Sequence, residues 1–232
     1  YFLALEGFRV TVFEALPVPG GMLRVGIPDY RLPPQVLDKE IQFITRLGVE
    51  IQLNTALGKD MSIADLKTRG YKAVYLSIGA HLSLKLNIPG EDATGVMPGV
   101  DFLRQVNLGE LKKLSGHVII VGGGDVAIDA ARCARRLGAD PVSIYYRRSR
   151  QEMPARENEV EDALDESIDI QFLTAPRQIL TKDNRVIGLQ CVRMELGAPD
   201  SSGRRRPVPV TGSELAVEAE MIIPAIGQTP AS

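Results

Sequence analysis

HVIIVGGGDVAIDAAR, residues His117–Arg132, is the stretch that decides the fold. It opens with Val118–Val121, a short apolar run rich in β-branched residues, which is typical of a buried parallel strand. Gly122, Gly124 and Ala127 then occupy the three small-residue positions of the motif G-x-G-x-x-G/A. In this motif small residues permit a tight turn, the close approach of a pyrophosphate and close packing of helix on strand. The stretch therefore predicts the strand, turn and helix of a dinucleotide-binding domain.

The start of the predicted helix is suited to an anion. The first N–H groups of a helix have no partner within it, and the helix dipole adds partial positive charge there. We expect the N–H groups of Gly124, Asp125 and Val126 to face the nucleotide phosphates, with Gly122 and Gly123 forming the turn before them.

A glycine motif alone is weak evidence for nucleotide binding, but the residues after it predict further elements of the same domain. A helix is expected over Asp125–Leu137, with small apolar residues at helical spacing and Gly138 as its stop. A second strand, Pro141–Tyr146, ends at Arg147 and Arg148. An acidic residue at this place binds the ribose of NAD, whereas arginine accommodates the 2′-phosphate of NADP. The sequence predicts NADP(H); chance glycines or a nucleotide-free Rossmann-like unit are disfavoured because strand, helix and arginines occur together.

Composition places the chain among ordinary soluble proteins. It has 232 residues, of which 44% are apolar, and a net charge of −2, enough for one or two domains. Bulk charge gives no case for nucleic acid, and no apolar run approaches the ~20 residues of a membrane span. We expect no membrane association and a cytoplasmic location. Cys133 and Cys191 stand far apart with no C-x-x-C motif, which disfavours a dithiol reductase and a cysteine-ligated metal site.

The first fourteen residues repeat the pattern that ends at Arg147. They read as the tail of a helix, Gly7, a β-branched strand and then Glu14. A carboxylate at that place binds the ribose of an adenine dinucleotide such as FAD. The matching glycine loop would fall before residue 1, so we expect a fragment or a start inside a crossover helix. The alternative is an ordinary first helix with a surface glutamate.

Further elements are expected from local pattern and from turn residues. Ordered loops are predicted at Leu16–Leu23 and Gly26–Pro34. Helices are predicted at Gln35–Leu47, within Lys59–Lys72 and at Arg156–Ser167. Strands are predicted at Val49–Leu53, Ala73–Ala80, Ile168–Thr174, Gln178–Lys182, Val186–Glu195 and Glu218–Pro224. The arginine-rich stretch Pro199–Pro207 is interpreted as a solvated hairpin tip, and His81 and His117 as structural histidines.

Six motifs, taken in order, carry a family resemblance. They are GGML at Gly20, GIPDYRLP at Gly26, IPGE at Ile88, VGGGDVAID at Val121, YRRSRQEMPA at Tyr146 and AIGQTP at Ala225. Across the whole chain the series resembles the small (beta) subunit of NADPH-dependent glutamate synthase. It is also similar to the flavin half of dihydropyrimidine dehydrogenase and to the large subunit of NADH-dependent ferredoxin:NADP oxidoreductase.

The resemblance implies an α/β flavoprotein with two Rossmann-like dinucleotide-binding domains. An NADP-binding domain, residues 111–224, is expected to be inserted into an incomplete FAD-binding domain, residues 1–110 and 225–232. The implied activity is transfer of a hydride from NADPH to FAD, followed by electron transfer to iron–sulfur clusters. Those 4Fe-4S clusters are expected in a missing domain or in a partner, most simply an amidotransferase-type large subunit.

The resemblance also implies roles for individual residues. Those expected to contact FAD are Glu14 at the ribose, Gly20, Gly21, Met22 and Leu23 over the flavin, Arg31, and Leu57 beside the adenine. Those expected to contact NADP are Gly122, Gly123, Gly124, Asp125, Val126, Arg147, Arg148, Ala225, Ile226 and Gly227. No catalytic acid or base is implied, because hydride transfer requires orientation of two cofactors rather than proton transfer by a side chain.

Two departures from the family pattern bear on function. Asp125 stands where asparagine is common in the glutamate synthase branch, although dihydropyrimidine dehydrogenase is similar to this chain there. Pro154 stands where a further NADP-binding arginine is found, so this contact is absent or provided by Arg150 or Arg156. The terminal acceptor is open between glutamate synthesis, pyrimidine reduction and ferredoxin reduction. A non-catalytic NADP(H)-binding fragment is a further alternative.

Replacing both Arg147 and Arg148 with alanine is expected to weaken the binding of NADPH far more than that of NADH. Each charge-assisted contact with phosphate contributes about 1.5–3 kcal/mol, and NADH lacks the 2′-phosphate. Dissociation constants for the two nucleotides measure the effect. An equal loss of affinity for both would reject the assignment.

Overall fold

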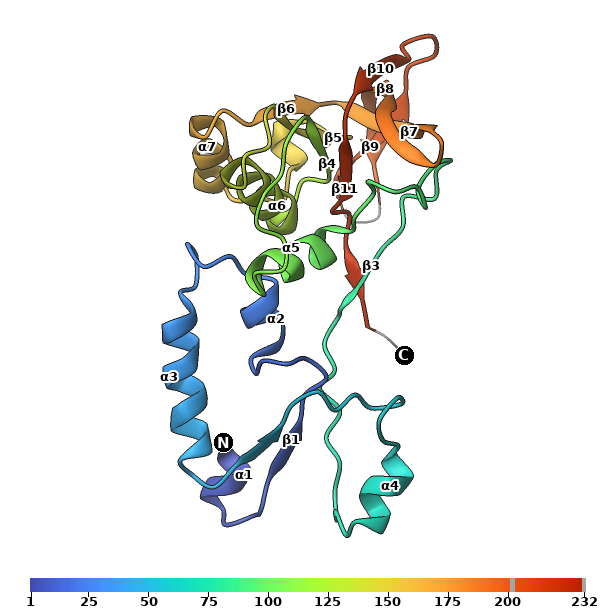
Figure 1. The fold of residues 1–232 in the computed structure, drawn as a ribbon. Coiled ribbons are helices and arrows are strands. Elements are labelled where there is room, and N and C mark those ends of the chain that lie inside the picture. Colours follow the sequence, from blue (N-terminus) through green and yellow to red (C-terminus); the bar gives the residue numbers. More distant parts are fainter. Residues whose placement is uncertain (201–202, 231–232) are drawn as a thin grey trace. The chain divides into compact units, whose positions relative to one another are not determined.

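The computed structural model describes residues 1–200 and 203–230. The chain divides into two compact units: Tyr1–Ala80 with Pro230 form the first, and His81–Thr229 form the second. Figure 1 shows their elements in chain order. The predicted division into an FAD and an NADP domain at residue 110 stays a prediction. Residues 231–232, which were expected to return to the FAD domain, lie outside the described residues.

The second unit is built on a parallel sheet with the strand order β11-β4-β5-β6. Its strands are β4 (Val118–Val121), β5 (Val142–Tyr146), β6 (Asp169–Phe172) and β11 (Met221–Pro224). Every residue of β4 and β5 is buried, as expected for strands covered on both faces. The predicted strands at these positions are confirmed, and the alternation of parallel strands with helices is that of a Rossmann-like domain.

Helix α6 (Asp125–Arg136) connects β4 to β5 and packs on both strands. Its alanines at helical spacing are fully buried, which brings the helix axis close to the sheet: Ala127, Ala130, Ala131 and Ala134. Gly138 has a φ of +101° just after the helix, a backbone conformation that glycine adopts readily and other residues avoid. The predicted helix and its stop are confirmed.

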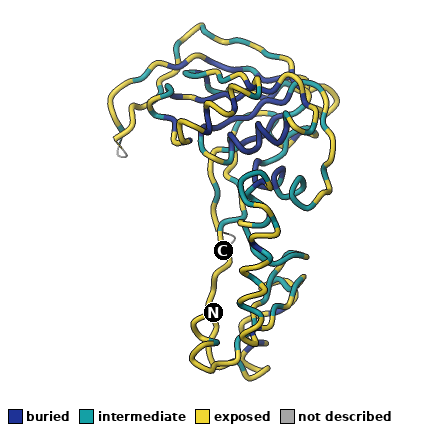
Figure 2. The backbone as a smooth tube through the Cα atoms, turned by 90° about the vertical axis from the view of Figure 1, so that its left-hand side faces the viewer, coloured by how far each residue is buried: buried dark blue, intermediate teal, exposed yellow. Residues whose placement is uncertain are grey.

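An antiparallel meander packs with the parallel sheet. It consists of β7 (Thr174–Lys182), β8 (Arg185–Pro199) and β10 (Leu215–Glu218), with β9 (Arg205–Pro209) paired to the far end of β8. Ile119 and Val121 of β4 share a buried cluster with Ile179 and Leu189 of the meander. Figure 2 shows the buried residues concentrated in this second unit.

Further elements complete the second unit. They are the helices α5 (Gly99–Asn107) and α7 (Glu157–Asp165), the 3-10 turn η1 (Arg150–Glu152), and the short antiparallel strands β3 (Leu82–Ser83) and β12 (Gln228–Thr229). Both α5 and α7 pack on α6. The predicted helix over Arg156–Ser167 is confirmed with ends one to two residues shorter.

The first unit contains a pair of parallel strands, β1 (Thr11–Phe13) and β2 (Glu50–Gln52). Helices α1 (Phe2–Leu5), α3 (Pro34–Thr45) and α4 (Ile63–Thr68) accompany them. The predicted helix at Gln35–Leu47 and the strand within Val49–Leu53 are confirmed. In α4, Ser62 and Asp65 form a reciprocal capping box, which satisfies N–H groups at the helix start.

Two predictions for the first unit are wrong. The stretch Leu16–Leu23 was expected to be loop, yet the short helix α2 (Gly21–Val25) begins inside it. An ion pair from Arg24 to Asp38 of α3 and the full burial of Val25 stabilise this turn of helix, and neither contact is visible in local composition.

The second error is the strand expected at Ala73–Ala80. These residues have no assigned secondary structure, and Tyr75 is 88% exposed. A strand exists only when a neighbour satisfies its backbone groups, and no ladder to this stretch is found among the described residues. The apolar pattern alone could not reveal whether a neighbour is present.

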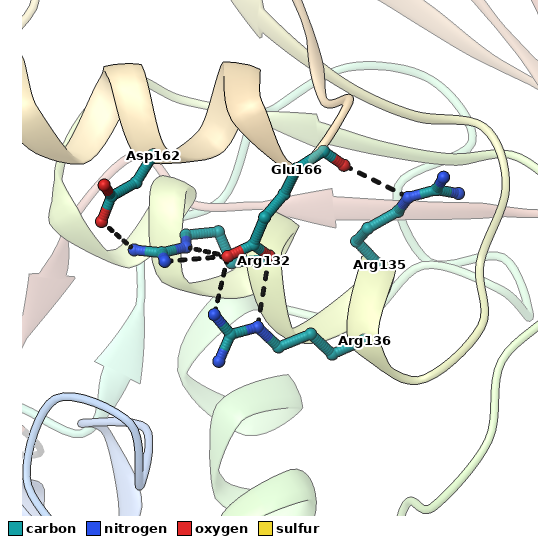
Figure 3. A network of polar contacts seen from close by, with 5 residues as sticks. All are labelled: Arg132, Arg135, Arg136, Asp162 and Glu166. Atoms are coloured by element: carbon teal, nitrogen blue, oxygen red, sulfur yellow. Dashed lines mark hydrogen bonds and ion pairs between the residues drawn. The ribbon is translucent and has the colours of Figure 1, made fainter.

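A network of charged side chains joins α6 to the end of α7 (Figure 3). Arg132 binds both Asp162 and Glu166, at 2.9 and 2.8 Å, and Arg136 binds Glu166 at 2.6 Å. Arg135 donates to the backbone carbonyl of Glu166. Burial opposes ionisation of Glu166, but hydrogen bonds from Arg136 and Arg132 outweigh it and lower the pKa of this carboxyl group. The network thus fixes α7 against the helix that follows the glycine loop.

Glu166→Gln is expected to lower the free energy of unfolding at pH 7 by about 1–2 kcal/mol, because it removes the carboxylate that Arg132 and Arg136 share. Glu161→Gln, at an exposed position of α7, is the matched control. Since the folded-state pKa of Glu166 is lowered, its stabilisation exists above the unfolded-state pKa and is lost as pH falls through the folded-state value. Denaturant unfolding at pH 7 and at acidic pH checks both statements, and equal effects of the two variants would contradict them.

Candidate functional site

The glycine loop after β4 lies against two neighbouring segments. A Cβ atom added to Gly122 would overlap the carbonyl oxygen of Ala225, and one added to Gly123 would lie 2.5 Å from the ring of Tyr146. A Cβ atom added to Gly124 would have, among the described residues other than its chain neighbours, only a carbon of Pro154 within 4 Å, at 3.9 Å. The first two glycines are therefore required by packing, whereas the third leaves open space. That space is where a pyrophosphate approaches the backbone in this motif.

The N-terminus of α6 begins at this open space. Gly124 is the N-cap residue and provides no side chain to cap the helix, while its carbonyl accepts hydrogen bonds from Ala127 and Ile128. The backbone N–H groups at the start of α6, those of Asp125 and Val126, are thus suited to an anionic ligand. Asp125 is exposed and Val126 half-buried. These features fit the phosphates of a dinucleotide.

Two arginines follow β5 at the same edge of the sheet. Val121 pairs with Tyr145 in the parallel ladder, so the glycine loop and Arg147 both follow the carboxyl ends of adjacent strands. Arg147 is exposed, whereas Arg148 is only 4% exposed. Both line a cavity of about 560 Å³ whose other wall is the β8–β9 hairpin, through residues including Asp200, Arg206 and Val208.

The buried arginine of this pair is held by the hairpin. Arg148 donates from Nε to the carbonyl of Arg205 at 2.8 Å, and its Nη2 atom lies 2.7 Å from Asp200. Arg205 in turn binds Glu152 at 2.6 Å. Sequence reasoning interpreted Pro199–Pro207 as a solvated tip and so missed this wall of the cavity. The acidic residue and the run of arginines were the available signal; residues 201–202 of that stretch lie outside the described residues.

The segment after β11 lies beside the loop. Ala225 donates its N–H to the carbonyl of Val121 at 2.7 Å, and Gly227 accepts from the N–H of Leu84 at 2.9 Å. Gly227 has a φ of +132°, and Ile226 is 42% exposed. The structure therefore brings Ala225 next to the glycine loop, and the assignment of Ala225–Gly227 to NADP stays a proposal.

The residues predicted for FAD lie in the first unit. Glu14 follows β1 and accepts the N–H of Leu16 at 2.9 Å through one carboxylate oxygen. Gly20 is the N-cap of α2 and Gly21 is its first residue, and both have a positive φ. Among the described residues beyond its own helix turn, a Cβ added to Gly21 would meet no atom within 4 Å, which fits a backbone that receives a bulky ligand. Their assignment to FAD stays a proposal.

The remaining predicted FAD residues have varied settings. Met22 is half-buried and its methyl group packs on Gly26, while Leu23 is 51% exposed. Arg31 is half-buried, and its backbone N–H binds the carbonyl of Pro28. Leu57 is 39% exposed and forms an isolated bridge with Met61.

The cysteines lack the properties of a redox pair. Cys133 and Cys191 are both free and buried, and burial raises the pKa of each thiol to about 12. Nucleophilic attack on a disulfide requires the thiolate, which such a pKa makes scarce near neutral pH. In the part of the chain that the structure describes, no cluster of three or more potential metal-ligating side chains is found. Likewise, none of its helices has the length and hydropathy needed to cross a membrane.

A glycine loop between a parallel strand and a helix, with arginines after the next strand, defines a dinucleotide-binding domain. The chain belongs to the pyridine nucleotide-disulphide oxidoreductase family, whose model matches residues 2–232. The predicted oxidoreductase class and its cofactors, NADP(H) and FAD, are thereby confirmed at the level of the family.

Curated relatives refine this placement. The chain is 51% identical over 231 residues to the NADP(+)-dependent formate dehydrogenase subunit beta of Moorella thermoacetica, covering 98% of this chain and 32% of that protein. It is 36% identical over 240 residues to the glutamate synthase [NADPH] small chain of Escherichia coli, covering 98% of this chain and 51% of that protein. The predicted resemblance to the glutamate synthase small subunit is confirmed. The chain spans about a third to a half of these relatives.

A solved structure shows the same fold. FprA from Mycobacterium tuberculosis, in complex with NADPH, matches with a TM-score of 0.79 and 22% sequence identity. The match covers 95% of this chain and 64% of that chain. The predicted fold class of Rossmann-like dinucleotide-binding domains is therefore confirmed.

Gly124→Ala is expected to weaken the binding of NADPH and of NADH alike, each by about tenfold or more, because the added methyl group occupies the space of the shared pyrophosphate. The free energy of unfolding is expected to fall by about 1 kcal/mol or less, since among the described residues other than its chain neighbours the methyl group meets only Pro154, and alanine is a poorer N-cap residue than glycine. Calorimetric titration and thermal unfolding measure the two effects. Unchanged affinity, or a loss confined to NADPH, would contradict the assignment of this glycine.

Proposed function

We propose that the chain is the pyridine-nucleotide side of an electron-input module that takes a hydride from NADPH and delivers the electrons through FAD. The observation that carries this proposal is the combination of an open glycine at the start of α6 with an arginine-lined cavity after β5. The first feature suits a pyrophosphate and the second an additional phosphate. NAD(H) lacks that additional phosphate, so the combination favours NADP(H).

The described side chains act by binding and orientation. Hydride transfer between nicotinamide and flavin is chemistry that the cofactors supply when both are bound. The backbone of Gly124–Val126 holds the pyrophosphate, the arginine pair after β5 selects the phosphorylated ribose with Arg147 as its exposed member, and Ala225–Gly227 borders the nucleotide on its other side. A misplacement of about 1 Å at the reacting carbon costs roughly two orders of magnitude in rate, so this backbone framework is the protein's main contribution.

The motifs found in these 232 residues are proposed to form only part of the FAD site. Glu14 and the Gly20–Leu23 turn are assigned to the ribose and to the flavin face, with Arg31 and Leu57 as further contacts. The printed sequence holds one G-x-G-x-x-G/A loop, and it belongs to the NADP side. We therefore expect weak or no retention of FAD by these 232 residues alone.

The electron acceptor is proposed to be an iron–sulfur protein or domain. The glutamate synthase relative favours an amidotransferase-type large subunit, whereas the more similar relative is named as a formate dehydrogenase beta subunit. Both are named as chains of multi-subunit enzymes, which supports a partner subunit. We propose that the electron-input role is common to these assemblies. Pyrimidine reduction and ferredoxin reduction are the other reactions that could receive the electrons.

In the intact protein that carries this chain, anaerobic addition of NADPH is expected to bleach the oxidised flavin absorbance near ~450 nm. NADH at the same concentration is expected to bleach it much more slowly. Rapid-mixing absorbance spectroscopy measures both rates. Binding of NADPH without any change in flavin absorbance would instead support the non-catalytic NADP(H)-binding module.

A further inference from the structure

The cavity after β5 contains a third arginine that the sequence motif does not supply. Arg147 and Arg148 come from the end of β5, and Arg206 enters from β9 on the hairpin. Asp200 is the acidic residue among those lining the cavity. The lining therefore carries an excess of two positive charges, which matches a phosphate monoester with a charge of about −1.5 to −2 at neutral pH.

The three arginines differ in whether their guanidinium groups are bound within the protein. Arg148 is buried and binds both Asp200 and the carbonyl of Arg205. Arg147 and Arg206 are exposed, and within residues 1–200 and 203–230 neither guanidinium has a hydrogen bond or an ion pair. The two arginines that are available to a ligand therefore come from opposite walls of the cavity.

The hairpin wall is fixed in place by three polar contacts. Arg148 holds it through Asp200 and through the carbonyl of Arg205, while the side chain of Arg205 binds Glu152. Ser149 donates to Glu152 at 2.5 Å. Hydrogen bonds from Ser149 and Arg205 lower the pKa of Glu152. The residue after Arg205, Arg206, is thereby presented at a defined place rather than on a mobile tip.

We propose that Arg206 is a specificity-determining residue that shares the 2′-phosphate of NADP(H) with Arg147. Arg148 is a positioning residue that ties the hairpin to the end of β5. This inference rests on the proposed binding of NADP(H). It adds that, of the two adjacent arginines, Arg147 contacts the phosphate and Arg148 positions the hairpin. A cavity of about 560 Å³ lies within the ~300–1,000 Å³ typical of small-molecule sites.

The test is equilibrium binding of NADP⁺ and NAD⁺ to the intact protein. Arg206→Gln is expected to weaken NADP⁺ by about 10- to 100-fold, the effect of losing one charge-assisted phosphate contact, and to change NAD⁺ by less than about twofold. Arg147→Gln should have the same selective effect. Arg193→Gln is the matched control, because Arg193 is an exposed arginine of β8 outside the cavity, and should leave both constants unchanged.

The positioning role has its own readout. Asp200→Asn is expected to lower the preference for NADP⁺ over NAD⁺ in the wild-type background and to cause no further loss in the Arg206→Gln background. Thermal unfolding of each variant shows whether the fold is retained. If the two substitutions lower the preference for NADP⁺ additively, or if Asp200→Asn raises that preference, the positioning role of Arg148 is overturned.

The outcomes separate this inference from the proposed function. A wild-type protein without preference for NADP⁺ over NAD⁺ overturns both. A wild-type preference that Arg206→Gln leaves intact, while Arg147→Gln abolishes it, overturns the role of Arg206 and keeps the proposed function.

Discussion

The closeness of the glycine loop to its neighbours is the constraint on which the rest of the second unit depends. Gly122 lies against the backbone of Ala225, Gly123 lies against the ring of Tyr146, and α6 buries four alanines at helical spacing. Because a Cβ at Gly122 or Gly123 would overlap these neighbours, only glycine fits at both positions between β4 and α6. The position of this loop puts the open space at Gly124 and the arginines after β5 at the same edge of the sheet, where a dinucleotide binds in this fold.

Much of the second unit could be predicted because its signals are local. Buried strands have continuous apolar runs, the turn has glycines, and the helix has alanines at helical spacing. The first unit was predicted less well. The stretch Ala73–Ala80 has a strand's composition, but pairing depends on a neighbour that no local pattern reports. Helix α2 forms because Arg24 reaches Asp38 and Val25 is buried, and both are tertiary effects.

The candidate site divides in the same way. Its glycines and its arginine pair follow from a motif with fixed spacing, and the structure places Ala225 against Gly122. The hairpin wall could not be predicted, since Arg148 and Asp200 are 52 positions apart and their contact depends on how β8 pairs with β9. Adjacent arginines in the sequence thus have different tasks: one is committed to a protein carboxylate and its neighbour faces the cavity.

The long strand β8 has a consequence for how the cavity tolerates change. One part of it pairs with β7 and β10 in the buried meander, and its far end pairs with β9. Alternate residues of a strand face opposite sides, so a slip of one position exchanges the two faces. Insertion or deletion of one residue in the meander part of β8 would therefore exchange the hairpin side chains that face the cavity with those that face away, so the lining of the cavity depends on interior positions of β8 as well as on the surface.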